Sequence, residues 1–150
     1  MSELINVSEK IKNLSGMARM KHLAEETERS GMAGNLDYTI LDYAPGSVIY
    51  RYTPKERHTN LIGSLHGGII ASLLDTAMGA AVLTTLEAGE SHTMTDLTVK
   101  FIRAVRDSSE QLTIHANVDH AGRRLFATEG IIKDSKDRIV ARAIANAARL

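Results

Sequence analysis

Residues 65–86 read LHGGIIASLLDTAMGAAVLTTL, an apolar run of helical length that contains one acid, Asp75. Three threonines, three glycines and this carboxylate make burial in a bilayer costly, so the run predicts a core helix over about Gly67–Leu86 and not a membrane span. Asp75 is the only formally charged side chain between Arg57 and Glu87. A carboxylate inside a buried helix is expensive unless it is paired or faces a cleft, so we expect Asp75 either in a cleft or in an ion pair with an arginine.

The predicted helix has two unlike faces. Residues at offsets of three, four and seven from Asp75 share its face, and they are small: Gly68, Ala71, Ser72 and Gly79. The opposite face is larger and apolar, with Ile69, Ile70, Leu73, Ala77 and Ala80. We therefore expect the apolar face to pack on a sheet, and the slim face to let a ligand or another backbone approach Asp75.

The start of the helix is a second candidate for chemistry. Gly67 and Gly68 follow His66, and the first amides of a helix have no intrahelical acceptor and lie at the positive end of the macrodipole. Such amides can polarise a carbonyl and stabilise an oxyanion. The alternatives are a tight turn at the glycines and a capping or packing role for His66.

The spacing of these two features predicts a dimer. His66 and Asp75 are nine residues apart, roughly 13 Å along a helix, and about 100° per residue places them on opposite sides. One carbonyl cannot touch both within one chain. If both act on one substrate, the second must come from a two-fold related copy, which gives two composite sites.

The rest of the chain predicts one α+β domain over residues 1–150, with residues 1–30 as an N-terminal helical extension. The expected helix covers 4–29, with Ser15-Gly16 as a candidate break into two pieces and Gly31 and Gly34 as stops. The expected strands are Leu36–Asp42, Val48–Thr53, Thr93–Ala104, Gln111–His120, Leu125–Lys133 and Ile139–Ala148, the last four as an antiparallel meander.

Composition excludes several function classes. The chain has 150 residues, a net charge of zero and no cysteine, which argues against nucleic acid and excludes disulfides and thiolate chemistry. No two of its six histidines are three or four residues apart, and a G-x-S-x-G elbow is absent, so neither a metal site nor a serine hydrolase is expected. The N-terminus lacks a signal-peptide pattern, and we expect a cytoplasmic protein.

The stretch from Asn60 to Asp75 resembles the PaaI-like hotdog thioesterases, whose motif N-x-x-G-x-x-H-G-G is followed by an aspartate seven residues after the last glycine. The resemblance extends from about residue 35 to the end. It implies a hotdog fold, in which a six-stranded antiparallel sheet wraps around a long central helix. It also implies a homodimer, often paired into a tetramer, that hydrolyses an acyl-CoA thioester to a carboxylic acid and CoA without a metal or other cofactor.

The resemblance assigns roles to single residues. Asp75 is expected to be the general base or the nucleophile, and the Gly67 amide to polarise the thioester carbonyl. Asn60 is expected to position the water or the carboxylate, and His66 to orient the acyl group or assist at sulfur. The family takes the three residues of the loop and helix start from one subunit and the acid from the other.

Three further expectations concern the rest of the site. A hydroxyl often lies on the strand after the helix and faces the acid; we assign it to Thr95, although Met94 would replace it if Met94 points inward. Arg123 and Arg124, in the turn after His120, are candidates for the CoA phosphates, with a solvated turn as the alternative. Gly68 and Ser72 on the slim face are expected to contact substrate. The alternative function is a non-catalytic acyl-CoA-binding or regulatory hotdog module.

Overall fold

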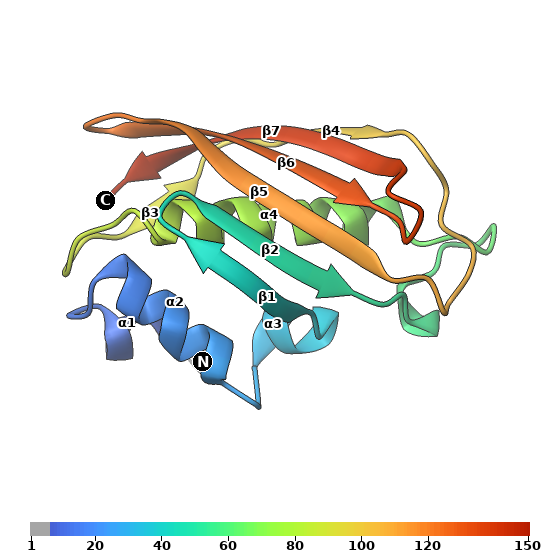
Figure 1. Cartoon of the computed structure of the whole chain (residues 1–150), viewed down its shortest axis with the longest axis horizontal. Helices are drawn as coiled ribbons and strands as arrows, with labels where there is room; N and C mark the ends of the chain where they lie inside the picture. Colours follow the sequence, from blue (N-terminus) through green and yellow to red (C-terminus); the bar gives the residue numbers. More distant parts are fainter. Residues whose placement is uncertain (1–6) are drawn as a thin grey trace, which may run out of the picture.

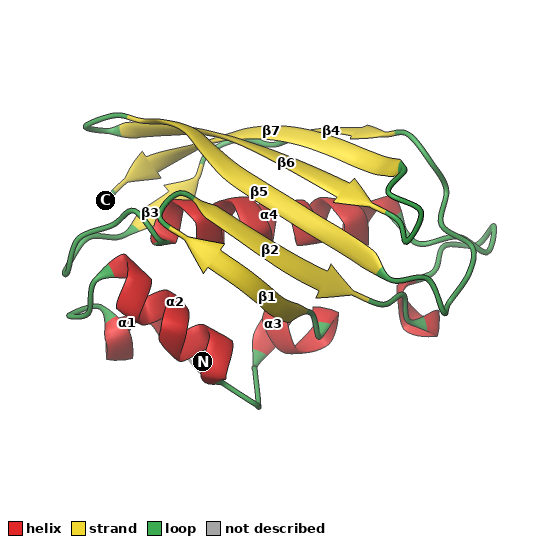
Figure 2. Cartoon of the chain, viewed as in Figure 1, coloured by secondary structure: helices red, strands yellow, loops and turns green. Residues whose placement is uncertain are grey.

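The fold is an antiparallel sheet curved around one central helix, α4 (Gly67–Leu83), as Figures 1 and 2 show. The computed structural model describes residues 7–150. The sheet order is β1-β2-β5-β6-β7-β3, and β4 also pairs with β7. The strands are β1 (Thr39–Ala44), β2 (Ser47–Tyr52), β3 (His92–Met94), β4 (Thr98–Phe101), β5 (Leu112–Ala121), β6 (Leu125–Lys133) and β7 (Ile139–Arg149). The predicted hotdog architecture is confirmed.

The edge of the sheet beside β7 differs from the prediction. One strand was expected over Thr93–Ala104, but the chain forms β3 and β4, which occupy one edge position, so seven strands fill six places. Between them, the Asp96 carboxylate accepts hydrogen bonds of 2.9 Å from the backbone N–H and the Nδ2 of Asn146. The Asp96 side chain thus takes the place of a backbone hydrogen-bonding partner of β7 between β3 and β4. The four-strand meander is also wrong, because β4 lies beside β7 and only β5, β6 and β7 are consecutive neighbours.

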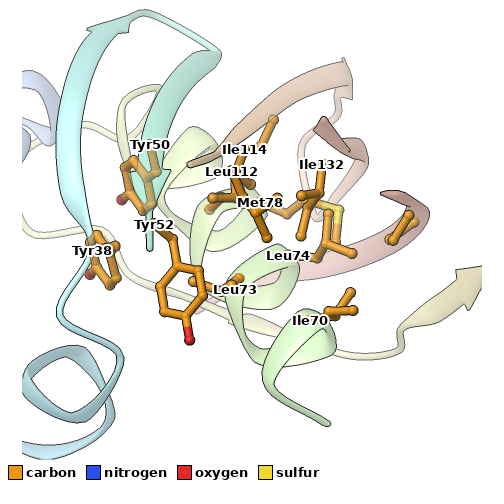
Figure 3. Packing of buried hydrophobic residues seen from close by; sticks show 14 of the residues in the cluster. Tyr38, Tyr50, Tyr52, Ile70, Leu73, Leu74, Met78, Leu112, Ile114 and Ile132 are labelled. Atoms are coloured by element: carbon orange, nitrogen blue, oxygen red, sulfur yellow. The ribbon is translucent and has the colours of Figure 1, made fainter. Parts of the chain in front are cut away.

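The core lies between the concave face of the sheet and α4. Alternate residues of β5 point inward as predicted, with Leu112, Ile114 and Ala116 buried. Figure 3 shows Leu74 and Met78 of α4 facing this layer. A Cβ added to Gly130 on β6 would lie 2.9 Å from the Leu74 side chain, so a glycine is needed for this close approach. Each fully buried aliphatic side chain of this kind contributes about 1.5–3 kcal/mol.

The N-terminal extension forms three short helices: α1 (Val7–Ile11), α2 (Gly16–Glu25) and α3 (Gly31–Leu36). The break considered at Ser15-Gly16 is confirmed, because Ser15 caps α2. The prediction of helix to residue 29 with stops at Gly31 and Gly34 is wrong, because α2 ends at Glu25 and Gly31 begins a helix that contains Gly34. The predicted helical residues 4–6 lie outside the described part. The start of α2 packs against the end of α4, because a Cβ on Gly16 would collide with the Leu83 carbonyl oxygen.

Helix α4 is shorter than predicted and ends at Leu83 instead of Leu86. The hydroxyl groups of Thr84 and Thr85 donate to the carbonyl oxygens of Ala81 and Val82, at 2.6 and 2.7 Å. These side chains satisfy carbonyl groups that continued helix would otherwise use. Within residues 7–150, no helix is long and apolar enough to cross a membrane.

Candidate functional site

His66 is the N-cap residue of α4. Its Nδ1 accepts a 2.8 Å hydrogen bond from the Gly68 N–H, and a Cβ on Gly68 would lie 3.0 Å from the same nitrogen. The capping interpretation of His66 is therefore correct. Because Nδ1 accepts, the neutral ring carries its hydrogen on Nε2. The exposed ring can then still donate a hydrogen bond from Nε2 to a ligand.

The Gly67 amide is the free donor at this helix start. Among the residues that the structure describes, it has no hydrogen-bond acceptor, whereas the next amide is bound to His66. The Phe101 ring of β4 lies over Gly67, since an added Cβ would be 3.1 Å from the ring Cζ. The Phe101 ring therefore occupies the side of residue 67 from which a Cβ would project.

Asn60 braces the loop that leads to His66. Its Oδ1 accepts from the backbone N–H groups of Ile62 and Ser64, both at 3.1 Å, and its Nδ2 donates to the Ser64 hydroxyl at 3.0 Å. Gly63, at φ +74°, closes the same turn. One hydrogen of the Asn60 amide remains for a water or a carboxylate, so its expected role in positioning stays a prediction.

Asp75 lies on the half-exposed side of α4. In the stretch from residue 7 to 150 its carboxylate makes neither a hydrogen bond nor an ion pair, so the arginine pair considered from the sequence is not formed within the chain. Burial raises the pKa of this carboxyl above its usual value. An acid that is partly desolvated and unpaired is a stronger base than one in water.

The slim face around Asp75 is the uncovered face of α4, as predicted. Gly68 is exposed, and Ala71, Ser72 and Gly79 are half-buried, while Leu73, Leu74 and Met78 on the other side are fully buried. The Ser72 hydroxyl donates to the Gly68 carbonyl at 2.8 Å. A free hydroxyl for the substrate is therefore not present at Ser72 in this arrangement.

Met94, and not Thr95, faces the helix. The Met94 side chain packs against both core clusters and would lie 3.8 Å from a Cβ on Gly79, one turn after Asp75. The Thr95 hydroxyl is exposed and donates to the Asn146 carbonyl at 3.2 Å. Of the two alternating positions considered from the sequence, the one that faces the helix carries the Met94 thioether. This chain therefore brings no hydroxyl from β3 toward its own Asp75.

Arg123 and Arg124 lie far from the helix start. They occupy the exposed turn between β5 and β6, at the end of the sheet where the chain terminates, whereas α4 begins at the opposite end (Figure 1). Their backbone carbonyls accept hydrogen bonds from Arg149, at 3.0 and 2.8 Å. One chain therefore holds three separate groups: the helix start, the middle of the slim face and this turn. Within residues 7–150 no cluster of side chains could hold a metal ion.

One hydrogen-bonded pair of residues beside the helix start was not predicted from the sequence. Tyr52 and His58 are both buried, and the tyrosine oxygen lies 2.7 Å from the histidine Nδ1. The His58 carbonyl accepts the His66 N–H at 2.9 Å. Alternation along β2 could have placed Tyr52 inward, but its contact with a histidine in the following loop depends on the folded path of that loop.

A sheet wrapped around one central helix, which here carries a glycine-rich start and one acid on its slim face, defines the hotdog fold. Residues 62–141 match the family model described as Thioesterase superfamily. The chain belongs to this superfamily.

Individual relatives support this membership. The human protein named Acyl-coenzyme A thioesterase 13 is 36% identical over 90 residues, which are 60% of this chain and 63% of the human one. The matched region thus spans less than two thirds of that relative. The E. coli PaaI protein from the phenylacetic acid degradation operon has the same fold, with a TM-score of 0.79 at 24% identity over 90% of this chain and 94% of PaaI. A conserved protein of Pseudomonas aeruginosa is 27% identical with a TM-score of 0.77, over 85% and 99% of the two chains.

Proposed function

We propose that this protein is an acyl-CoA thioesterase, which hydrolyses the thioester to a free carboxylic acid and CoA. The observation that carries the proposal is the Asp75 carboxylate, which is half-buried, unpaired in the described chain and raised in pKa, on the open face of α4. A module that only binds acyl-CoA has no need for a base there. The name of the human relative supports the substrate class.

The chemistry assigned to each group follows from its free atoms. Asp75 removes a proton from water as the water attacks the thioester carbonyl, or attacks that carbon itself to form an anhydride that water then cleaves. The Gly67 N–H donates to the oxygen that becomes negative in the transition state. The His66 Nε2–H can donate a hydrogen bond to the sulfur as the carbon–sulfur bond breaks, and CoA leaves as a thiolate that takes its proton from water or from protonated Asp75. Asn60 keeps the loop in place.

We further propose that the site is shared between two copies of the chain. Asp75 and the Gly67 amide are eight residues apart, roughly 12 Å along one helix, so one carbonyl cannot contact both. The edge of β4 is open, and apolar side chains are exposed beside it and in the loop before α4: Leu61, Ile62, Phe101 and Ile102. An open strand edge next to exposed apolar groups fits a two-fold contact with a second copy. Tetramer formation by two such dimers remains an expectation from the family.

The CoA end of the substrate is assigned to the turn between β5 and β6. The side chains of Arg123 and Arg124 are exposed and make no ion pair in the described chain, so both guanidinium groups are available for phosphate oxygens. No cofactor takes part in the proposed reaction. We place the protein in the cytoplasm, where acyl-CoA is available.

The activity is tested with a panel of acyl-CoAs and a thiol-release assay. We expect hydrolysis by the wild type and a loss of about 100-fold or more in kcat for Asp75→Asn, since removal of a general base costs on the order of 10²–10⁴. Asp42→Asn is the matched control, because Asp42 is an exposed acid on β1. Wild-type binding without turnover would instead support the acyl-CoA-binding module.

The shared site is tested by complementation. Asp75→Asn and His66→Ala are each expected to be nearly inactive, and we mix them under conditions that let subunits exchange. Half of the dimers should then be mixed, with one intact site of two, so activity should recover to about a quarter of the wild-type value. A mixture that stays inactive, although mass spectrometry shows mixed dimers, would place both residues in a site of one chain.

A further inference from the structure

Tyr52 and His58 form a buried hydrogen bond. Tyr52 is 1% and His58 3% exposed, and their rings are stacked with centroids 6.0 Å apart. The Tyr52 oxygen lies 2.7 Å from the His58 Nδ1, and the tautomer of the ring decides which of the two donates. Figure 3 shows the Tyr52 hydroxyl directed away from the rings of Tyr38 and Tyr50.

The Nε2 of His58 is the ring nitrogen that does not contact the Tyr52 hydroxyl. In the described chain that nitrogen is buried and has no hydrogen-bond partner. Burial, followed by the charges of Arg57 and Lys55, lowers the pKa of His58, which keeps the ring neutral. A buried polar nitrogen without a partner is unfavourable, so the position of this ring has to be maintained by the surrounding contacts.

The backbone of His58 is joined to the candidate site. Its carbonyl oxygen accepts the His66 N–H at 2.9 Å, and the neighbouring Thr59 forms an antiparallel bridge with Leu65. These contacts close the loop that Asn60 braces and deliver His66 to its place at the start of α4. A shift of the His58 ring is therefore transmitted to the cap and to the free Gly67 amide.

We propose that His58, locked by Tyr52, is a positioning residue that sets the geometry of His66 and of the Gly67 amide. It touches no substrate and acts through the backbone of His66. This inference rests on the proposed thioesterase function for its effect on turnover. The contacts themselves make a structural prediction that does not depend on activity.

The experiment compares Tyr52→Phe with Tyr50→Phe. Tyr50 is a matched control on the same strand and face: it is also buried, and its ring stacks on that of Tyr38 with centroids 4.5 Å apart. We expect Tyr52→Phe to lower kcat about ten-fold with little change in KM, because a displaced amide acts mainly on the transition state. Tyr50→Phe should keep the wild-type kcat, even if both variants melt at lower temperature.

Two further measurements separate positioning from general damage. His58→Asn places an amide oxygen near the position of Nδ1 and should retain most of kcat, whereas His58→Leu should lose it. In ¹⁵N-labelled protein, the amide signals of His66 and Gly67 should shift in Tyr52→Phe and not in Tyr50→Phe. Unchanged kcat and unchanged amide signals in Tyr52→Phe and His58→Leu would overturn the inference. If the wild type hydrolyses no acyl-CoA, the proposed function falls, and the amide signals alone decide whether His58 positions the helix start.

Discussion

Replacement of Gly67 by alanine tests the free amide directly. The added Cβ would lie 3.1 and 3.3 Å from Cζ and Cε1 of the Phe101 ring, which is slightly closer than ordinary contact. Phe101 is 59% exposed and lies on the open edge of the sheet, so its ring can turn aside. Alanine also suits a helix better than glycine by about 0.5–1 kcal/mol. The free energy of unfolding should therefore change by less than about 1 kcal/mol.

Activity should respond far more strongly than stability. We expect the new methyl group, close to the Gly67 nitrogen, to crowd a carbonyl oxygen that approaches the Gly67 N–H, and loss of one such donor costs on the order of 10²–10³ in kcat. The assay measures thiol release at saturating acyl-CoA, beside thermal unfolding followed by circular dichroism. The double variant Gly67→Ala with Phe101→Leu relieves the ring contact and should remain inactive. A folded Gly67→Ala protein with wild-type kcat would refute the role of this amide.

Three further predictions concern stability and pH. Asp75→Asn should be more stable than the wild type at pH 7, with the difference shrinking toward pH 4 in urea titrations, since a raised native pKa makes the folded state lose stability as pH rises from about 3.9 through that pKa. Arg19→Met should lower the free energy of unfolding by about 2–4 kcal/mol in the same titration, because the buried guanidinium donates to the carbonyl oxygens of Glu90 and Glu87 at 2.9 and 3.0 Å. Met94→Ala should cost about 2 kcal/mol in thermal unfolding, since it removes packing between two core clusters.

Regular hydrophobic patterns allowed most of the sheet and α4 to be predicted. The bounds of β6 were predicted as observed, and β5 and β7 within one residue, because alternation over nine or more residues leaves little freedom of register. The break between β3 and β4 was missed, since it depends on Asp96 and Asn146, which are fifty positions apart. Local propensity contains no information about such a contact. The helix beginning at Gly31 was missed because glycine normally predicts an end.

The candidate site was predictable as a list of residues but not as an arrangement. The motif identified His66, Gly67 and Asp75, yet the sequence left open whether His66 caps the helix. The orientation of Met94 needed the register of β3 against β7, where Met94 pairs with Ala147. The Tyr52 contact with His58 needed the path of the intervening loop. Each of these depends on tertiary structure and not on local pattern.

The hydrogen bonds around the helix start distinguish the groups that hold the structure together from the groups that remain available for a reaction. The Oδ1 of Asn60 and the Nδ1 of His66 are already occupied within the chain. Besides one hydrogen of the Asn60 amide, the groups at the described helix start and slim face that have no partner are the Gly67 N–H, the Nε2–H of His66 and the Asp75 carboxylate. Two donors and one acceptor match what thioester hydrolysis requires: a donor for the carbonyl oxygen, a donor for the leaving sulfur and an acceptor for a proton of water. Because the acceptor lies roughly 12 Å from the donors along the same helix, we propose that the complete set forms where two copies meet.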